Sequence, residues 1–575
     1  MIFKAPYLRK SIRTQGEKST ALNQARGRVV IVGLAFLIAY SAVALRAFDL
    51  SVLRGVDHGA QEEEFYDYTA ATKNVRGDIV DRNGVLLATT LPSASLFADP
   101  ALIMEHEELA GELVKIFPAL DYGATLQKLQ AQSRFVWLER NISPQQQHAV
   151  LQLGQPGLGF EHETRRYYPQ GALASHLVGY TNVDDRGLGG VERSFDTHLG
   201  EGKPLKLSLD IRLQHVLHRE ISQAISDFTA KAGAGVIMDA NTGEILAGVS
   251  LPDFDPSQMN NIRAEQMFNN LTLGVYELGS MFKIFSTAAV LDLNKIALGY
   301  EFDAREPIKI GRFTINDYHA ENRILTVPEV FMYSSNIGSA KMGEMVGTEA
   351  LRKFYSDLGL LERMEFEINE IGRPMVPSPW RDVHTLTASY GHGVATTPLQ
   401  MSAAVASIVN GGLLVKPRLV IDDAANSPEN NPEIDSAIRV ISPQTSLKMR
   451  GLLRLVVTEG TGGNADVPGY EVGGKTGTAE KIGANGRYDR KRLISSFVAA
   501  FPASDPKYVV MIMVDEPKGN KKSYGYATAG WVAAPPVART VSSMAAILGL
   551  PPAYKPEEQD FAHPLKQYVS AKESH

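Results

Sequence analysis

The chain has 575 residues, which is too long for one hydrophobic core, so we expect two or more domains. Hydrophobic residues make up 44% of it and charged residues 21%, a globular composition that excludes a disordered chain. The net charge of -6 gives no reason to expect a nucleic-acid partner, and the absence of cysteine excludes thiol catalysis, thiolate metal sites and disulfides.

The first predicted element is an apolar helix over residues 29–48. Val29 to Leu45 contains no charge over 17 residues, and further apolar residues follow Arg46. That length is just enough to cross a bilayer core of about 30 Å, so we expect one transmembrane helix at 29–48. A secretory signal has a shorter apolar core and a small-residue cleavage site, and we find no convincing cleavage site after Leu45. A buried core helix is the other interpretation.

The charges around this helix predict its orientation. Residues 1–28 carry seven Lys or Arg against one Glu, whereas the far flank is acidic, with QEEEFYD at 61–67. By the positive-inside rule, residues 1–28 form a cytoplasmic tail and everything after about residue 49 lies outside the cytoplasm.

Residues 49–205 mix short strands and turns with one helical stretch at about 100–131. VRGDIVDRNGVLLATT (75–90) predicts a hairpin with Asn-Gly at its turn, and two Gly- and Arg-rich stretches follow at 165–180 and 187–196. We expect a structural module of hairpins. An ion-paired clasp of Arg76, Arg82 and Glu192 between such pieces is a further hypothesis, which spacing alone does not establish.

From about residue 206 a strand and a long amphipathic helix are predicted, followed by a second hairpin at 233–250. Apolar runs again alternate with turns at EVGGKTGTAEK, LISSFVAAFP and KYVVMIMVDEP, and a helical stretch ends the series. This order indicates an α+β fold, an antiparallel sheet with helices on its faces. The segment 256–450 is predicted mostly helical, with a loop at 422–437. Residues 553–575 are predicted to be a mobile tail.

YELGSMFKIF (276–285) places a serine and a lysine three residues apart where an apolar helix begins. Ser280 and Lys283 are open to two interpretations: a helix cap with a solvated lysine, or a nucleophile with its base. The residues that follow are apolar nearly all the way around, so the helix is buried. A lysine on the same face of a buried helix needs a partner or a function. A second pair, Ser504 and Lys507, falls in a predicted turn and is set aside.

A serine nucleophile must lose its proton to a base, and no histidine is near Ser280 in the sequence. A lysine serves only if it is neutral, and burial with a second cation nearby lowers its pKa. A serine–lysine enzyme therefore predicts another positive charge and further hydroxyl groups in the same site.

Two other stretches supply these groups. YSSNIG (333–338) places Ser334 and Asn336 in a turn before an apolar helix. GGKTGTAEK (473–481) places four candidate residues on a predicted strand, where a glycine lets a substrate backbone lie close: Lys475, Thr476, Gly477 and Thr478. The order and spacing of the three motifs are those of the penicillin-recognising serine enzymes.

With these motifs the chain resembles the class B penicillin-binding proteins, most closely the division-specific (septal) peptidoglycan D,D-transpeptidases of Gram-negative bacteria. The resemblance covers about residues 25–550 and includes RGDIVDRNG, RRYYPQG, GLGGVERSFD, YGHGVATTPLQM and WVAAPP. It implies a transpeptidase domain at 206–552, which has the penicillin-binding-protein transpeptidase fold and includes a helical subdomain. An elongated, non-catalytic pedestal of the dimerisation type at 49–205 and one membrane helix precede it.

The resemblance also implies roles. Ser280 is the acylated nucleophile and Lys283 its general base. Ser334 relays a proton to the leaving group, and Asn336 holds the substrate amide. The strand residues, Lys475 to Thr478, bind substrate: Lys475 and Thr476 take the terminal carboxylate region, and the backbone N–H of Thr478 joins that of Ser280 in an oxyanion hole. No metal or cofactor is implied.

The implied substrates are peptidoglycan stem peptides, with β-lactams as inhibitors. The implied reaction opens D-Ala-D-Ala on one stem, releases D-Ala and passes the acyl group to an amine of a neighbouring stem. The implied partners are a polytopic SEDS-family glycosyltransferase and other division proteins. The implied location is the inner membrane at the division septum, with a periplasmic catalytic domain. Leu278 and His392 depart from the usual family residues, outside the three motifs.

Four other interpretations compete with this one. An elongation-type transpeptidase of the same class is the nearest alternative. A serine β-lactamase deacylates with a glutamate-activated water, and EFEIN, from Glu365 to Asn369, looks superficially like its glutamate-bearing loop. However, MEFEINEI alternates apolar and charged residues, which predicts an exposed strand. A non-enzymatic penicillin sensor would need several membrane spans and a cytoplasmic signalling domain, and the sequence indicates neither. A catalytically inactive scaffold is at odds with three intact motifs.

Overall fold

The computed structural model describes residues 17–48, 75–293, 295–311, 313–421, 438–483 and 486–570. The chain divides into two units, residues 1–74 and 75–575. The predicted acidic flank at 61–67 and the predicted loop at 422–437 lie outside the described residues.

The first unit contains the helix α1, Glu17–Phe48, of 32 residues. Its segment Arg26–Leu45 has a mean hydropathy of 2.2, and none of that segment is buried within the protein. By length and composition this helix is a candidate membrane span. It begins at Glu17, ahead of the predicted start, because the polar residues before Val29 also favour a helix.

The second unit begins with a sheet built around the long strand β2, Leu86–Ala98. Strand β2 pairs antiparallel with β1, which forms the predicted hairpin, and also with β3 and β4. Strand β1 in turn pairs in parallel with β7. The partner strands are β1 (Ile79–Val80), β3 (Val136–Ile142), β4 (Leu158–Tyr167) and β7 (Leu205–Lys206).

Three helices pack on the far end of β2 around a small core of their own. They are α3 (His106–Ile116), α4 (Tyr122–Leu129) and α5 (Pro144–Gln152), after a 3-10 turn η3 (Pro100–Leu102). The predicted single helical stretch at 100–131 is therefore divided. Pro118 follows the last residues of α3 and cannot continue a helix, and the side chain of Asp121 caps the start of α4.

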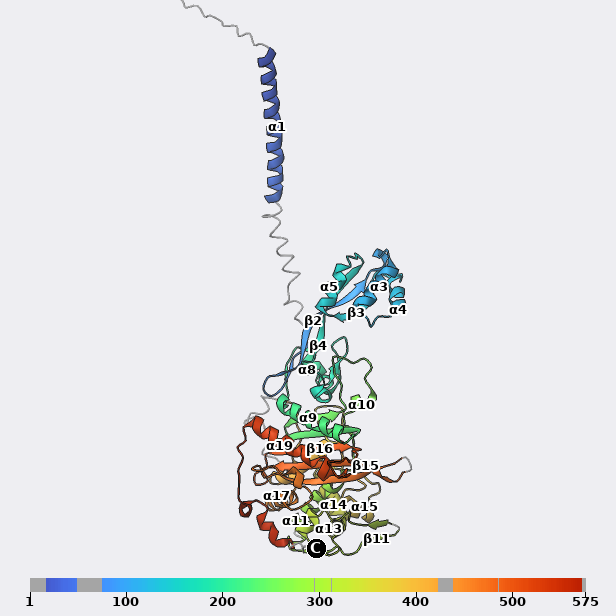
Figure 1. The fold of residues 1–575 in the computed structure, drawn as a ribbon, viewed down its shortest axis with the longest axis vertical. Helices are drawn as coiled ribbons and strands as arrows, with labels where there is room; N and C mark the ends of the chain where they lie inside the picture. The colour runs from blue at the N-terminus through green and yellow to red at the C-terminus, as the bar shows by residue number, and fades with distance from the viewer. Residues whose placement is uncertain are drawn as a thin grey trace, which may run out of the picture. The chain divides into compact units, whose positions relative to one another are not determined.

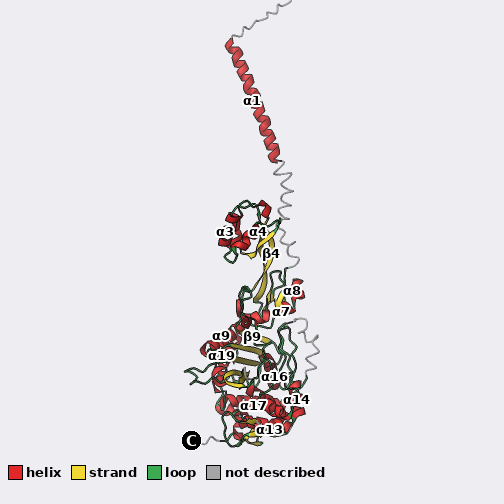
Figure 2. Ribbon diagram, turned by 90° about the vertical axis from the view of Figure 1, so that its right-hand side faces the viewer, coloured by secondary structure: helices red, strands yellow, loops and turns green. Residues whose placement is uncertain are grey.

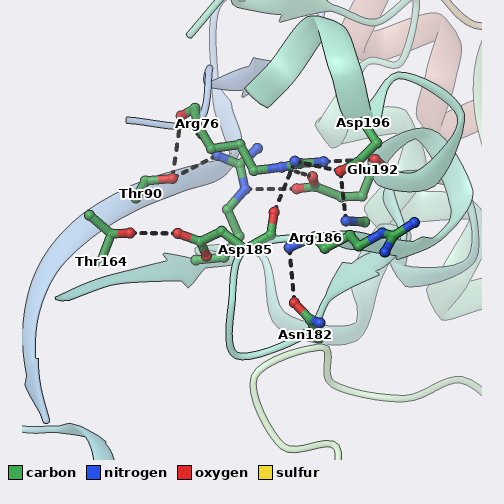
Figure 3. A network of polar contacts seen from close by, with 10 residues as sticks. Arg76, Thr90, Thr164, Asn182, Asp185, Arg186, Glu192 and Asp196 are labelled. Atoms are coloured by element: carbon green, nitrogen blue, oxygen red, sulfur yellow. Dashed lines mark hydrogen bonds and ion pairs between the residues drawn. The ribbon is translucent and has the colours of Figure 1, made fainter. Parts of the chain in front are cut away.

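The predicted clasp forms with one different member (Figure 3). Glu192 is fully buried and accepts from Arg76 Nε at 2.6 Å and from Arg166 Nε at 2.7 Å. Arg76 also pairs with Asp196 at 2.7 Å. Arg82 is not a member, because its side chain reaches Glu244 instead, at 3.3 Å. Removing one partner from such a buried pair typically costs about 3–5 kcal/mol, so the clasp fixes this part of the fold.

Short elements around the clasp lead toward the larger domain. They are η4 (Gly171–Ala174), α6 (Ser175–Val178), β5 (Tyr180–Thr181), β6 (Gly187–Gly189), α7 (Gly190–Ser194) and α8 (Asp196–Gly200). Strands β5 and β6 pair antiparallel with each other.

The larger domain is organised by a five-stranded antiparallel sheet in the order β14-β15-β16-β8-β9. The strands are β8 (Ala232–Asp239), β9 (Ile245–Leu251), β14 (Gly473–Ile482), β15 (Tyr488–Phe501) and β16 (Tyr508–Asp515). The central strands are apolar nearly throughout because helices cover both faces. The predicted antiparallel sheet with helices on its faces is confirmed, as is the hairpin at 233–250.

Helices α9 (Ile211–Asp227) and α19 (Ala534–Leu548) pack together on one face of this sheet. Helices α11 (Lys283–Asp292), α16 (Pro398–Val409) and α17 (Pro443–Thr458) belong to the core on the other face. In Figure 1, α9 lies above β15 and β16 and α17 lies below them, and Figure 2 shows α17 below α9 and α19.

The remaining helices belong mostly to the predicted helical subdomain. They are α10 (Ala264–Met267), η5 (Gly279–Phe282), α12 (Val327–Met332), α13 (Asn336–Val346), α14 (Thr348–Asp357), α15 (Asp382–Ala388), η6 (Gly463–Ala465) and α18 (Ala529–Val532). Two small hairpins pair β10 (Glu301–Asp303) with β13 (Ile324–Thr326), and β11 (Ile308–Ile310) with β12 (Phe313–Ile315).

The predicted exposed strand at 364–371 is wrong. This segment is a loop in which Ile368 and Ile371 are buried, while Glu365 is 90% exposed and pairs with Lys416 at 3.7 Å. The alternation of apolar and charged residues comes from a loop that buries two side chains, with no strand partner beside it in the described part of the chain.

The prediction of a mobile tail at 553–575 is also wrong for the residues up to 570, which pack on the larger domain. Residues 557–568 form two 3-10 helices, η7 (Glu557–Gln559) and η8 (His563–Tyr568). Ala562 is fully buried and Leu565 is 9% exposed, both within the core that contains α17. The proline- and charge-rich composition of this segment predicted a mobile tail because, of its described residues, only these two apolar ones are buried against the core. Residues 571–575 lie outside the described part.

Candidate active site

The predicted nucleophile lies where a short 3-10 turn, η5, leads into the buried helix α11. Gly279, just before Ser280, has a φ of +55°, a conformation that favours glycine. A Cβ at Gly279 would lie 2.6 Å from the carbonyl oxygen of Thr478. This glycine therefore lets the loop that carries Ser280 approach strand β14 closely.

Lys283 is fully buried one turn after Ser280. Its Nζ lies 3.0 Å from Ser280 Oγ and 3.0 Å from Ser334 Oγ, 2.8 Å from Asn336 Oδ1 and 2.5 Å from the Ser334 carbonyl oxygen. The last two atoms are acceptors only. A neutral amine has two hydrogens for them, which leaves its lone pair free to accept from the Ser280 hydroxyl. The arrangement fits a general base.

The surroundings favour that neutral form. Burial is the main cause that lowers the pKa of Lys283, the positive charge of Lys475 lowers it further, and Asp317 opposes the shift. Lys475 is also fully buried, and burial lowers its pKa to about 7. The second cation that a serine–lysine site predicts is thus present.

Ser334 lies between the two lysines. Lys475 Nζ donates to its Oγ at 3.1 Å, and Lys283 Nζ lies 3.0 Å from the same oxygen. The backbone of Ser334 has a φ of +62°, which is uncommon for a residue other than glycine. Strain of this kind persists where the surrounding structure enforces it, often at a functional site.

Asp317 is a site residue that the sequence did not reveal. Its Oδ1 accepts from the backbone N–H of Asn336 at 2.5 Å and of Ile337 at 2.9 Å, and its Oδ2 accepts from Ser335 Oγ at 2.7 Å. Asp317 therefore caps the start of α13 and holds Asn336 toward Lys283. A capping residue 18 or more positions upstream leaves no local pattern in the sequence.

Lys475 to Thr478 lie on β14, at one end of the strand order of the sheet. Thr476 Oγ1 lies 3.0 Å from Thr461 Oγ1, and Thr478 Oγ1 accepts from the backbone N–H of Ala529 at 3.1 Å. A Cβ at Gly477 would lie 2.4 Å from the Leu278 carbonyl oxygen. The sequence predicted that Gly477 lets a substrate backbone lie close to the strand. The structure shows a different role, because the absence of a side chain at Gly477 lets the loop that carries Ser280 pack on β14.

His392 lies in an aromatic cluster near Lys283. Its ring centroid is 5.2 Å from Tyr390 and 5.2 Å from Tyr488, and the Tyr488 hydroxyl donates to Glu277 at 3.0 Å. Burial, with a smaller contribution from Lys283, lowers the pKa of His392 to about 4. His392 is therefore neutral at pH 7, and Lys475 remains the candidate for the second cation.

The structure thus brings five of the predicted residues into mutual contact through Ser334 and Lys283, and it places Thr476 to Thr478 beside them on β14. The set offers a candidate nucleophile, a candidate base, a hydroxyl between two amines and a strand at the edge of the sheet. Among the described residues, no group of three His, Asp or Glu side chains is arranged to hold a metal ion.

Comparison with known proteins agrees with this geometry. Residues 233–538 match the penicillin-binding protein transpeptidase domain, and residues 71–199 match the penicillin-binding protein dimerisation domain. The chain is 38% identical over 496 residues to a probable peptidoglycan D,D-transpeptidase FtsI of Caulobacter vibrioides, which covers 84% of this chain and 83% of that protein. It is 30% identical over 482 residues to the peptidoglycan D,D-transpeptidase FtsI of Escherichia coli K12, at 78% and 80% coverage.

Among solved structures, penicillin-binding protein 3 of Mycobacterium tuberculosis, in complex with ampicillin, is similar with a TM-score of 0.67 and 26% identity. The match covers 84% of this chain and 98% of that one.

Proposed function

Because this chain belongs to the class B penicillin-binding proteins, with both their transpeptidase and their dimerisation domain, we propose that Ser280 is the nucleophile of a septal peptidoglycan D,D-transpeptidase. The chain is a serine-type transpeptidase of the division type. The observation that carries the assignment of the nucleophile is the 3.0 Å contact between Ser280 Oγ and the Nζ of the buried Lys283.

The proposed first step is acylation. Neutral Lys283 takes the proton of Ser280 while Oγ attacks the carbonyl carbon between the two D-Ala residues of a stem peptide. The oxyanion accepts hydrogen bonds from the backbone N–H groups of Ser280 and Thr478. The C–N bond then breaks, Ser334 relays a proton to the leaving D-Ala amine, and an ester remains on Ser280.

The second step reverses these roles. The amine of a neighbouring stem attacks the ester carbonyl, a proton passes from that amine to the departing Oγ, and a new amide links the two stems. Lys475 and Thr476 hold the terminal carboxylate region of the donor stem in the first step. Asn336 Nδ2 donates to the Asn316 carbonyl oxygen at 2.8 Å and keeps a second hydrogen for a substrate carbonyl.

Labelling with a fluorescent penicillin tests this function. The wild-type protein is expected to become covalently labelled, and Ser280→Ala is expected to lose all labelling while keeping its thermal stability. Labelling of Ser280→Ala at the wild-type rate would overturn the assignment. The position of the label in dividing cells, at the septum or along the side wall, separates the division type from the elongation type.

The N-terminal helix supports a finer proposal. It is expected to cross the inner membrane once, with the catalytic domain in the periplasm, and to contact a polytopic SEDS-family glycosyltransferase and other division proteins. Gly33, Ala35 and Ala39 are exposed small residues that allow close helix packing in lipid. Replacing residues 29–48 by an unrelated span should preserve penicillin labelling but impair division. Full complementation by this chimera would refute a specific role of the span.

A further inference from the structure

The last described part of the chain, residues 553–570, crosses α17 and reaches α12; we call it the C-terminal strap. In Figure 1 it is the dark red segment that runs down from α19. It begins at Ala553, whose backbone N–H donates to the Gly469 carbonyl oxygen at 2.8 Å, and Lys555 pairs with Glu471 at 2.7 Å. The first residues of the strap are thus held against the segment at 469–471.

The middle of the strap is joined to strand β14 through one arginine. Asp560 accepts from Arg454 Nε at 2.9 Å and pairs with its Nη2 at 2.8 Å. Arg454, which lies on α17 with a side chain 9% exposed, also donates to the Val472 carbonyl oxygen at 2.9 Å. Val472 lies directly before β14 and three residues before Lys475. Asp560, together with Asp466, which accepts from Arg454 Nη1 at 2.6 Å, therefore orients the side chain that holds the start of that strand.

Two side-chain contacts, one apolar and one between a cation and an aromatic ring, also hold the strap on α17. Leu565 lies against α17 so closely that a Cβ at Gly451 would be 2.8 Å from its Cδ1. The guanidinium of Arg450 lies 5.6 Å from the ring centroid of Phe561. These contacts, together with the buried Ala562, fix the strap in one register on α17.

The end of the strap contacts the helix that leads to Ser334. The backbone N–H of Ser570 donates to Glu329 Oε1 at 2.8 Å, and Thr326 Oγ1 donates to the Tyr568 carbonyl oxygen at 2.7 Å. Thr326 and Glu329 form the capping box at the start of α12. This helix has six residues, about 9 Å, and it ends two residues before Ser334.

The strap therefore joins the supports of two groups whose separation matters for the chemistry. One connection runs through Arg454 to the strand of Lys475, and the other runs through Glu329 to the helix before Ser334. Lys475 Nζ and Ser334 Oγ are 3.1 Å apart. Phe331, on α12, lies below the same amine, with its ring centroid at 5.9 Å. A shift of α12 against β14 would change both distances.

We propose that the C-terminal strap is a positioning element, which holds Ser334 in register with Lys475 for acylation. The inference rests on the proposed function, because it assigns a role to the strap only if those two residues serve Ser280. A displacement of about 1 Å in an active site costs up to about 10²-fold in rate. Loosening the strap is therefore expected to slow acylation on the order of tenfold.

The test uses two matched acid-to-amide variants of the full-length protein. Asp560→Asn weakens the contact with Arg454, whereas Glu557→Gln alters an acid that is 74% exposed and pairs with Lys566 on the strap itself. For each, the acylation rate at saturating labelled penicillin is measured across pH together with the thermal midpoint. We expect Asp560→Asn to acylate on the order of tenfold more slowly, with a shifted pH profile, and Glu557→Gln to match the wild type.

Two truncations extend the test. A chain that ends at Lys555 should acylate slowly and recover when a synthetic peptide of residues 556–570 is added, whereas a chain that ends at Ser570 should match the wild type. If the shorter chain does not fold, the two point variants decide. A stability loss in Asp560→Asn with a wild-type acylation rate and pH profile would overturn the positioning role. Failure of the wild-type protein to label at Ser280 would instead overturn the proposed function, and this inference with it.

Discussion

The amines of two fully buried lysines, Lys283 and Lys475, lie 3.0 and 3.1 Å from one atom, the hydroxyl oxygen of Ser334. A hydroxyl has two lone pairs and one hydrogen. Lys475 donates to this oxygen, and a neutral Lys283 has its two hydrogens on Asn336 Oδ1 and the Ser334 carbonyl, so the hydroxyl's own hydrogen is left for another acceptor. That hydrogen is available to a leaving group, which is the role proposed for Ser334. The same closeness helps to keep Lys283 neutral, because the positive charge of Lys475 lowers the pKa of Lys283.

The first prediction concerns the base. Lys283→Met keeps much of the side-chain volume within the buried helix but removes the lone pair that faces Ser280. Loss of proton abstraction should slow acylation by about 10² to 10⁴-fold. The rate is measured with labelled penicillin, and circular dichroism checks that the fold remains. Acylation of this variant at the wild-type rate would contradict the role of Lys283.

The second prediction concerns the stability cost of Lys475. Its pKa is about 7 in the folded protein, against an ordinary value of 10.5, so between these values the unfolded chain binds the extra proton. The free energy of unfolding should therefore rise with pH from about 7 to about 10.5 through this group. One pKa unit corresponds to about 1.4 kcal/mol.

Lys475→Met removes this buried, proton-binding group. We expect it to raise the free energy of unfolding at pH 7 by at least about 1 kcal/mol, and to lose acylation because the carboxylate of the drug has no cation to meet. Urea unfolding at pH 7 and at pH 10 measures the effect, and the gain should shrink at the higher pH. A destabilised variant at pH 7 would contradict the prediction.

The nucleophile and its closest neighbours were predictable because each motif is local. Ser280 and Lys283 share one helical face, and Ser334 and Asn336 lie in one turn, so spacing alone brought each pair together. Asp317 and Arg166 were not predictable, since their contacts depend on segments that meet only in the folded chain. The strap was hidden for another reason. Its buried residues, Ala562 and Leu565, are few among prolines and charges, and their partners on α17 lie about a hundred positions upstream.

The third prediction concerns the carboxylate that caps α13. Asp317→Ala removes the acceptor of two backbone N–H groups and of Ser335, so Asn336 loses its support. We expect a loss of about 1 kcal/mol in stability and a slower acylation. Asp121→Ala is the matched control, because Asp121 caps α4, which belongs to the small core at the far end of β2. The Asp121 side chain accepts from the Ala124 backbone N–H at 2.8 Å. A comparable stability loss without slower acylation is expected there. Equal acylation rates in both variants would refute the positioning role of Asp317.

The fourth prediction concerns the contact between the nucleophile loop and strand β14. A methyl group at Gly477 would clash with the Leu278 carbonyl oxygen at 2.4 Å and approach Ser496 Oγ at 2.8 Å. Gly477→Ala should therefore displace the loop, and acylation should fall by about 10²-fold. Gly111→Ala is the control, since nothing lies within 4 Å of a Cβ there, and it should acylate as the wild type does. A wild-type rate in Gly477→Ala would show that the loop does not depend on this contact.

The last prediction is that the acyl-enzyme formed with penicillin persists. Hydrolysis of the ester on Ser280 needs a water held and activated by a base, and a β-lactamase supplies a glutamate for this. The look-alike here, Glu365, is 90% exposed in a loop and pairs with Lys416 at 3.7 Å, so its carboxylate is engaged at the surface. Without such a base, which is worth about 10² to 10⁴-fold, deacylation should be far slower than acylation, and the labelled protein should survive denaturation as a covalent band on a gel. Glu365→Gln should leave the lifetime of the band unchanged. Rapid turnover of penicillin by the wild-type protein, abolished in Glu365→Gln, would instead identify a β-lactamase.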